Sequence, residues 1–197
     1  MQESRIQRWF AFIAVLFVIA AAVFIMIRPA SEKPTIGENI VETPKLNQFV
    51  NAKYGIEFSY PEGYVLTEHD VGNTAERDHH AIVIMRAEDA TNLPEAGEGP
   101  TSITIDIYGN NIDKQTVERF IHNTSASNFK LSIDEKIATT TVAGEQALSY
   151  TWDGLYRGDS TVLAHKDNIF MFSVTYMDTA AIIRDDFAYM LSTVRFQ

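Results

Sequence analysis

The sequence predicts an α+β domain, in which an antiparallel β-sheet is flanked by helices, preceded by one N-terminal transmembrane helix. Three observations predict this fold class. Short stretches that alternate apolar and polar residues recur beyond residue 48, with turn residues between them, as half-buried antiparallel strands do. Two further stretches carry apolar residues at helical spacing. Ahead of them, residues 9–27 form an uninterrupted apolar run.

The apolar run reads WFAFIAVLFVIAAAVFIMI and contains no charged residue. At about 1.5 Å per helical residue it just crosses a hydrocarbon core of about 30 Å. Trp9 stands at its first position, where an indole ring favours the membrane interface. A cleaved signal peptide is the alternative, although its apolar region normally has only about 7–15 residues. We predict an uncleaved signal anchor that holds the chain in the lipid bilayer, with residues 1–8 as a short cytoplasmic tail.

Residues 28–47 are predicted to be a linker rich in Pro and Glu. Three prolines stand among Glu, Lys and Thr, a composition that buries little apolar surface and favours an extended tether. Two Arg precede the apolar run, and one Arg and one Lys follow it closely, so the flanking charges are nearly balanced. We predict a single-pass protein with a cytoplasmic N-terminus and an extracytoplasmic domain over residues 48–197.

The strands of this domain are predicted from alternation. Ile103, Ile105 and Ile107 share one face of the clearest example. Short turns such as Asp153-Gly154 separate neighbouring stretches, which favours an antiparallel meander. The polar stretch 71–78 is predicted to be a loop. The predicted strands are Ile56–Tyr60, Tyr64–His69, Ala81–Arg86, Ser102–Tyr108, Ala138–Val142, Gln146–Trp152, Thr161–His165 and Ile169–Tyr176.

Two amphipathic helices are predicted. Asp113 is a suitable N-cap for a helix over Lys114–Asn123. Asp178 is a suitable N-cap for a longer helix over residues 179–194. The stretch 88–100 between strands is acidic, contains Gly and Pro, and is predicted to be a loop. The apolar stripe predicted for the second helix consists of Ile183, Phe187, Met190, Leu191 and Val194.

Composition excludes several classes of function. The chain contains no cysteine, which excludes disulfides, thiol catalysis and thiolate zinc sites. Beyond residue 45 it has 22 acidic and 11 basic residues, and such a balance disfavours nucleic-acid binding. No Gly-x-Ser-x-Gly motif is present, so a hydrolase of that type is not indicated. We predict that the domain is not an enzyme and has no cofactor.

Two segments resemble the PsbP family of extrinsic photosystem II proteins, which has many bacterial relatives. The first is YGIEFSYPEGY at Tyr54–Tyr64, an aromatic-rich strand that leads into a Pro-x-Gly-aromatic turn. The second is FAYMLSTVRF at Phe187–Phe196, a terminal helix followed by a strand-like tail. The resemblance covers residues 48–197 and implies an α/β/α sandwich. It also implies association with calcium or manganese, without assigning ligand positions in this chain.

One group of residues has the chemistry of a metal site. His69, Asp70, Asp78 and His79 would gather at one end of a hairpin if the strands on either side of the predicted loop pair. Imidazole and carboxylate ligands together suit zinc, manganese or copper, while calcium is implied only by the resemblance. Adjacent residues of a strand point to opposite faces, so His79 and His80 would not readily bind one ion. A solvated polar hairpin end explains the same residues more simply, so we expect no stoichiometric metal here.

An aromatic cluster offers a second candidate site. Tyr150, Trp152 and Tyr156 lie close to the Asp153-Gly154 turn. They form either an exposed patch for a protein partner or a set of packed cross-strand pairs. Asn123-Thr124-Ser125 also matches an N-glycosylation acceptor.

These observations predict a membrane-tethered extracytoplasmic accessory or binding domain that contacts another envelope protein. The alternative is an envelope protein that binds Ca, Mn or Zn through the His/Asp hairpin.

Overall fold

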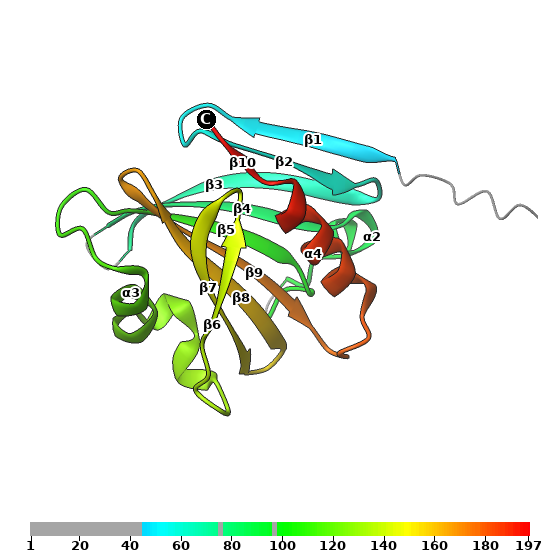
Figure 1. Cartoon of the computed structure of the whole chain (residues 1–197). Coiled ribbons are helices and arrows are strands. Elements are labelled where there is room, and N and C mark those ends of the chain that lie inside the picture. Colours follow the sequence, from blue (N-terminus) through cyan, green and yellow to red (C-terminus); the bar gives the residue numbers. More distant parts are fainter. Residues whose placement is uncertain (1–44, 75–76, 96–97) are drawn as a thin grey trace, which may run out of the picture. The chain divides into compact units, whose positions relative to one another are not determined.

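The computed structural model describes residues 45–74, 77–95 and 98–197 (Figure 1). The predicted cytoplasmic tail, the predicted membrane anchor and nearly all of the predicted linker lie outside these residues. Within the described ranges, no helix is both long enough and apolar enough to span a bilayer.

The described domain contains two β-sheets, and every pairing between its described strands is antiparallel. The small sheet has the order β1-β2-β10, and the large sheet has the order β3-β4-β5-β9-β8-β7-β6. The strands are β1 (Leu46–Asn51), β2 (Ile56–Pro61), β3 (Tyr64–Thr74), β4 (Arg77–Arg86), β5 (Ile103–Gly109), β6 (Ala138–Val142), β7 (Glu145–Asp153), β8 (Arg157–His165), β9 (Asn168–Tyr176) and β10 (Arg195–Phe196). The helices are α2 (Ala87–Thr91), α3 (Val117–Asn123) and α4 (Ile182–Thr193), with 3₁₀ turns η1 (Ser125–Ser127) and η2 (Phe129–Leu131).

All eight predicted strands are present, and the predicted meander is confirmed for β6 to β9. Lys166 has φ 51° in the tight turn between β8 and β9. The strand β5 departs from this simple order, because it lies between β4 and β9. That placement brings the end of the β3–β4 hairpin next to the loop that follows β5.

The β3–β4 hairpin is longer than predicted. The stretch 71–78 was predicted to be a loop, but pairing continues to Thr74 and Arg77. The register shifts between Asp70 and Gly72, and Gly72 has φ +88°, a conformation that glycine adopts without a steric cost. A bulge therefore carries a polar, Gly-containing segment into the ladder, which alternation alone does not reveal.

Each face of the large sheet carries its own hydrophobic core, which confirms the predicted arrangement of a sheet between helices. Phe170 and Phe172 point to the face covered by α4 and the small sheet. Ile169 and Met171 point to the opposite face, covered by α3 and the 3₁₀ turns. Figure 1 shows α4 beside the small sheet and α3 well apart from it.

Both helices begin later than predicted. The first begins at Val117, because Thr116 is the N-cap and its Oγ1 accepts a hydrogen bond from Arg119 N at 3.2 Å. Asp113, the predicted cap, is engaged in an ion pair instead. The second helix begins at Ile182, while the carboxylate of Asp178 accepts from Ala180 N in the preceding turn.

The apolar stripe of α4 is largely confirmed. Ile183, Phe187, Met190 and Val194 are buried in the core between the large sheet and α4, which we call the first core, whereas Leu191 is only partly buried. Three elements were not predicted as such. β1 begins within the last two residues of the predicted linker, α2 begins one residue before the predicted loop 88–100 and lies mostly within it, and β10 closes the small sheet.

Candidate functional site

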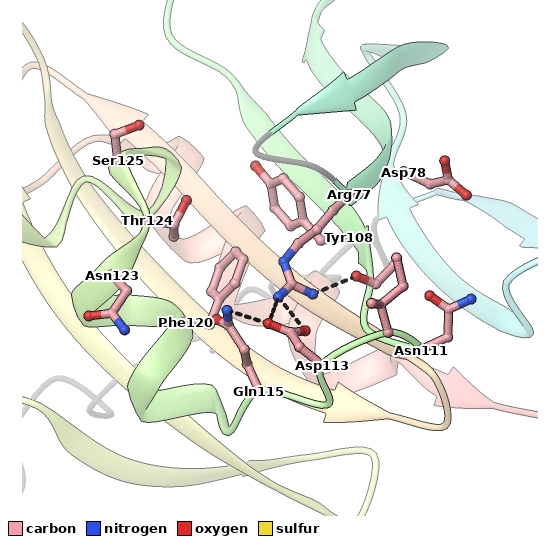
Figure 2. A pocket seen from close by; sticks show the side chains of 12 residues that line it. Arg77, Asp78, Tyr108, Asn111, Asp113, Gln115, Phe120, Asn123, Thr124 and Ser125 are labelled. Atoms are coloured by element: carbon pink, nitrogen blue, oxygen red, sulfur yellow. Dashed lines mark hydrogen bonds and ion pairs between the residues drawn. The ribbon is translucent and has the colours of Figure 1, made fainter.

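A polar hollow of about 530 Å³ lies where β4 begins and β5 ends, between the hairpin, the β5–α3 loop and α3 (Figure 2). Its walls come from segments far apart in the sequence. Figure 2 shows the ring of Tyr108 and the guanidinium of Arg77 at its centre, with the residues that follow α3 along one side. The lining includes Arg77, Tyr108, Asn111, Asp113, Thr124 and Ser125.

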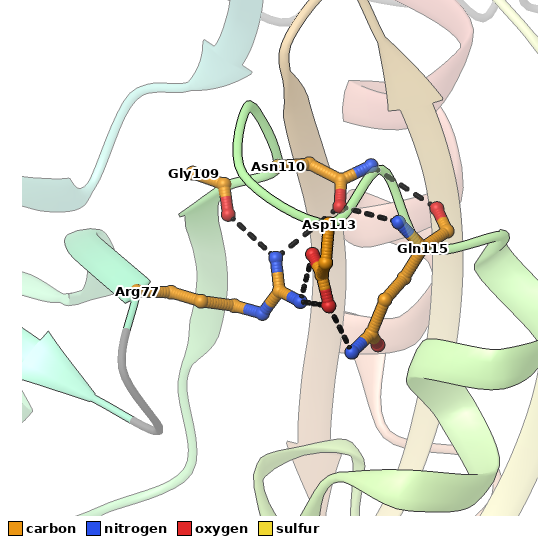
Figure 3. Close-up of polar contacts among 5 residues, drawn as sticks. All are labelled: Arg77, Gly109, Asn110, Asp113 and Gln115. Carbon is orange, nitrogen blue, oxygen red and sulfur yellow. Dashed lines mark hydrogen bonds and ion pairs between the residues drawn. The ribbon is translucent and has the colours of Figure 1, made fainter.

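Arg77 is the centre of the polar network at this hollow (Figure 3). Its Nη1 donates to Gly109 O at 2.9 Å and to Asn110 Oδ1 at 3.2 Å. Its Nη2 lies 2.5 Å from both carboxylate oxygens of Asp113. The Arg77 side chain is only 11% exposed, and charge-assisted bonds of this kind are roughly twice as strong as neutral ones. The network ties the base of β4 to the loop after β5.

Asn110 shapes that loop. Its Nδ2 donates to Gln115 O at 3.1 Å, and its Oδ1 accepts from Gln115 N at 2.9 Å. Its backbone N–H donates to Asp167 O at 2.7 Å. These three bonds hold the loop closed against the β8–β9 turn, and Lys114 takes a left-handed φ of 47° within it. Asn110 is buried, so its polar groups need these partners.

The pKa of the Asp113 carboxyl is lowered, chiefly by the hydrogen bond from Arg77. A carboxylate with a folded-state pKa below its unfolded value stabilises the fold above about pH 4, and this stabilisation is lost as the pH falls through the lowered pKa. Asp113→Asn is therefore expected to lower Tm at pH 7, with a difference that shrinks to zero as the solution is acidified. Thermal melts of both proteins from neutral to acidic pH check this. The exposed Glu95→Gln is the control and should leave Tm unchanged, and a Tm difference for Asp113→Asn that persists in acid would contradict the ion-pair explanation.

The aromatic wall of the hollow is closely packed. Tyr108 stacks on His79 with ring centroids 4.3 Å apart and lies 5.0 Å from the ring of Phe120. Burial raises the pKa of the Tyr108 hydroxyl, so this group is neutral at physiological pH. With the Arg77 charge balanced by Asp113, the hollow presents hydrogen-bonding groups and a ring surface. This chemistry suits the binding of a polar side chain or loop.

The predicted metal ligands lie on the β3–β4 hairpin, and the two histidines among them have separate partners. His69 Nε2 is 3.2 Å from Thr67 Oγ1, and His79 Nε2 is 2.7 Å from Asp106 Oδ1 on β5. Asp78 is exposed at the edge of the hollow. Among the residues that the structure describes, no three His, Asp or Glu side chains are grouped so that they could hold a metal ion.

Asp70, the remaining predicted metal ligand, contacts His80. Its Nδ1 lies 2.8 Å from Asp70 Oδ1, and its Nε2 lies 3.1 Å from Glu68 Oε2. The two carboxylates are on opposite sides of the ring and do not converge on one point. The hydrogen bond from His80 is the main reason that the pKa of Asp70 is lowered. His80 meets Tyr54 while His79 stacks on Tyr108, so the two histidines do point to opposite faces, as predicted.

The aromatic cluster is mostly buried, which favours packed side chains over an exposed patch. Tyr150 and Trp152 are 4% and 8% exposed, because the 3₁₀ turns and α3 cover this face of the sheet. The Tyr150 hydroxyl donates to Ser127 O at 2.6 Å, and burial raises its pKa to about 12. Tyr156 is half-buried and donates to Gly99 O at 3.0 Å. The alternative of packed aromatic side chains holds for the first two residues.

Sequence reasoning missed the Arg77–Asp113 network. Arg77 fell in a predicted loop and Asp113 was interpreted as a helix cap. The two residues are 36 positions apart, and no local pattern connects them. Only the pairing of β4 with β5 brings them together.

No protein-family model matches the chain, and no curated protein matches its sequence. Among solved structures, it is similar to the solution structure of cyanobacterial PsbP (CyanoP) from Synechocystis sp. PCC 6803. The identity is 15%, with 80% of this chain and 95% of that chain covered, and the TM-score is 0.53. A crystal structure from Bacteroides thetaiotaomicron also matches, at 8% identity and a TM-score of 0.46, covering 76% of this chain and 48% of that one. The domain therefore has a PsbP-like fold.

Proposed function

We propose that this chain is a membrane-tethered accessory domain on the outer side of a membrane, where it binds another envelope protein and catalyses no reaction. The observation that carries the proposal is the PsbP-like fold over 80% of the chain. A fold alone does not determine an activity, so the proposal also rests on the anchor, the linker and the charge of this chain.

The N-terminal sequence supports the tether. Residues 9–27 are apolar and residues 28–44 contain three prolines, which suits an anchor followed by an extended linker. A linker of this kind confines a domain to a thin layer above the bilayer and raises its effective concentration toward a membrane partner. Weak contacts then suffice for binding. The excess of 22 acidic over 11 basic residues beyond residue 45 would steer the domain toward a basic surface.

The topology can be tested directly, because the chain has no cysteine. Ile112 is 83% exposed on the loop after β5, so Ile112→Cys places one thiol on the domain surface. We expect a membrane-impermeant maleimide to label this thiol in intact cells. The cysteine-free chain is the control. Labelling that requires cell lysis would reverse the proposed orientation.

Partner binding is tested by capture. Fragment 44–197 is expected to bind solubilised membranes from its own source at low salt, and to bind less as salt screens charges beyond about 10 Å at 0.1 M. An unrelated protein of equal net charge is the control for general ion exchange. Capture that is independent of salt would contradict electrostatic steering.

Elemental analysis of the same purified fragment tests the alternative of a metal-binding protein.

A further inference from the structure

Several turns lie at the end of the large sheet that is opposite the Arg77 hollow. Pairing of Tyr64 with Arg86 and of Arg157 with Tyr176 places the start of β3, the end of β4, the start of β8 and the end of β9 at this end. The β7–β8 turn and the β9–α4 connection therefore lie together here (Figure 1). We call it the turn end of the domain.

Large aliphatic side chains are exposed at the turn end. Leu155 is 71% exposed in the β7–β8 turn, and Met177 is 77% exposed directly after β9. Ile133 is 82% exposed in the segment after η2. The end of η2, two residues before Ile133, meets the β7–β8 turn, since Leu131 Cδ1 lies 3.3 Å from where a Cβ on Gly154 would be. Exposed apolar groups gathered in this way mark interaction sites more often than isolated ones do.

The first described residue of the domain, Lys45, also lies at the turn end. Glu62 N donates to Lys45 O at 2.9 Å, and Ala87 N donates to Gly63 O at 2.8 Å. These bonds place Lys45 beside the β2–β3 turn and the end of β4. Residues 28–44 reach at most about 60 Å when fully extended. A partner for this end must therefore lie within the reach of this linker, as the outer surface of a membrane protein does.

The charge of the turn end favours a protein partner over a lipid surface. The segments 86–95, 130–136, 153–157 and 176–186 at the turn end carry nine Asp and Glu against five Lys and Arg. Anionic headgroups attract basic segments and repel acidic ones, and interfacial anchoring uses Trp and Tyr. The strongly exposed apolar side chains here are aliphatic instead. This combination complements an apolar protein patch with basic residues at its rim.

We infer that the turn end is the docking face of the domain, and that its occupant is the extracytoplasmic surface of an integral membrane protein with an apolar patch and a basic rim. The inference rests on the proposed function and assigns the face that performs it. The Arg77 hollow lies at the opposite end and stays free when the turn end is occupied.

Single cysteines in the full chain test this face. Leu155→Cys and Met177→Cys report on the turn end, while Ile112→Cys and Val71→Cys report on the opposite end, where the native residues are 83% and 51% exposed. The rate of labelling by an impermeant maleimide is measured in native membranes and in liposomes that contain only the purified full chain. We expect labelling at Leu155→Cys and Met177→Cys to be about tenfold slower in native membranes than in liposomes, as mass action gives for a mostly occupied site. The two control positions should label equally fast in both.

Three results would overturn the inference. If the two turn-end positions label more slowly than the two control positions, and to the same degree in native membranes and in liposomes, the bilayer would be the occupant. Protection of Ile112→Cys or Val71→Cys instead would place the docking face at the hollow. Equal labelling of all four positions in both membranes would show that neither end is covered. In each of these cases, salt-sensitive capture of the domain would still support the proposed function, so the two failures are distinguishable.

Discussion

Replacing Gly158 by alanine is expected to destabilise the domain severely. A Cβ at this position would lie 2.2 Å from both Cε2 and Cζ2 of Trp152. The indole has little room to move, because it is 8% exposed and its Nε1 donates to Ser160 Oγ at 3.0 Å. Overpacking a well-packed core commonly costs about 1–3 kcal/mol, and a clash this close should reach the upper end of that range or exceed it. Chemical denaturation of fragment 44–197 measures the loss.

Two further variants show whether the clash is the cause. Gly99→Ala adds the same methyl group where nothing lies within 4 Å, and should change the free energy of unfolding by less than about 0.5 kcal/mol. Trp152→Phe removes the outer ring atoms Cζ2 and Cη2, two of the atoms that a Cβ on Gly158 would meet. In the Gly158→Ala background this change should cost less than in the native background, which a double-mutant cycle measures. Additive effects would show that the indole is not the obstacle.

Removal of the C-terminal helix is expected to abolish cooperative folding. Deletion of residues 178–197 removes α4 and β10, including Met190 and Phe187, which are 0% and 5% exposed in the first core. Truncating such a side chain alone costs about 2–5 kcal/mol, and the total stability of a domain is about 5–15 kcal/mol. The helix is also held by polar contacts, since Arg184 Nε donates to Asp159 Oδ2 at 2.8 Å and Tyr64 donates to Asp186 at 2.5 Å.

Two single substitutions in α4 test how much its buried and exposed side chains contribute to stability. Met190→Ala should lower the free energy of unfolding by about 2–5 kcal/mol. Ile182→Ala, at a position that is 63% exposed in the first turn, should change it by less than about 0.5 kcal/mol. Both are measured by denaturant titration. A deletion variant that melts cooperatively at the native temperature would show that α4 does not hold the core.

Local periodicity accounts for what could be predicted about the elements. The alternation in Ile103, Ile105 and Ile107 placed all three on one buried face, because side chains of a strand repeat every second residue. The short turn between β8 and β9 could also be predicted, from its Lys, Asp and Asn residues. The start of α3 was not, since Thr116 and Asp113 are both good caps by composition and only the ion pair with Arg77 removes Asp113 from that role.

The candidate sites could not be predicted in the same way, because each depends on which segments meet in space. Trp152 is polar at one end and apolar elsewhere, so its sequence context fits an exposed patch as well as a core. It is buried because η1, η2 and α3 cover that face of the sheet. Likewise, the histidines of β4 were placed on opposite faces by alternation, but their partners Asp106 and Asp70 follow from the neighbouring strands.

The sequence by itself determined that this chain carries an acidic, cysteine-free α+β domain with an antiparallel meander and two amphipathic helices. Composition, alternation and turn chemistry are properties of neighbouring residues, and they need no knowledge of the rest of the fold. The tertiary structure decided the Arg77–Asp113 network, the aliphatic turn end and the burial of Trp152. The network arises because β5 inserts between β4 and β9, and Trp152 is buried because η1, η2 and α3 cover its face of the sheet. Both depend on the packing of the whole domain rather than on neighbouring residues.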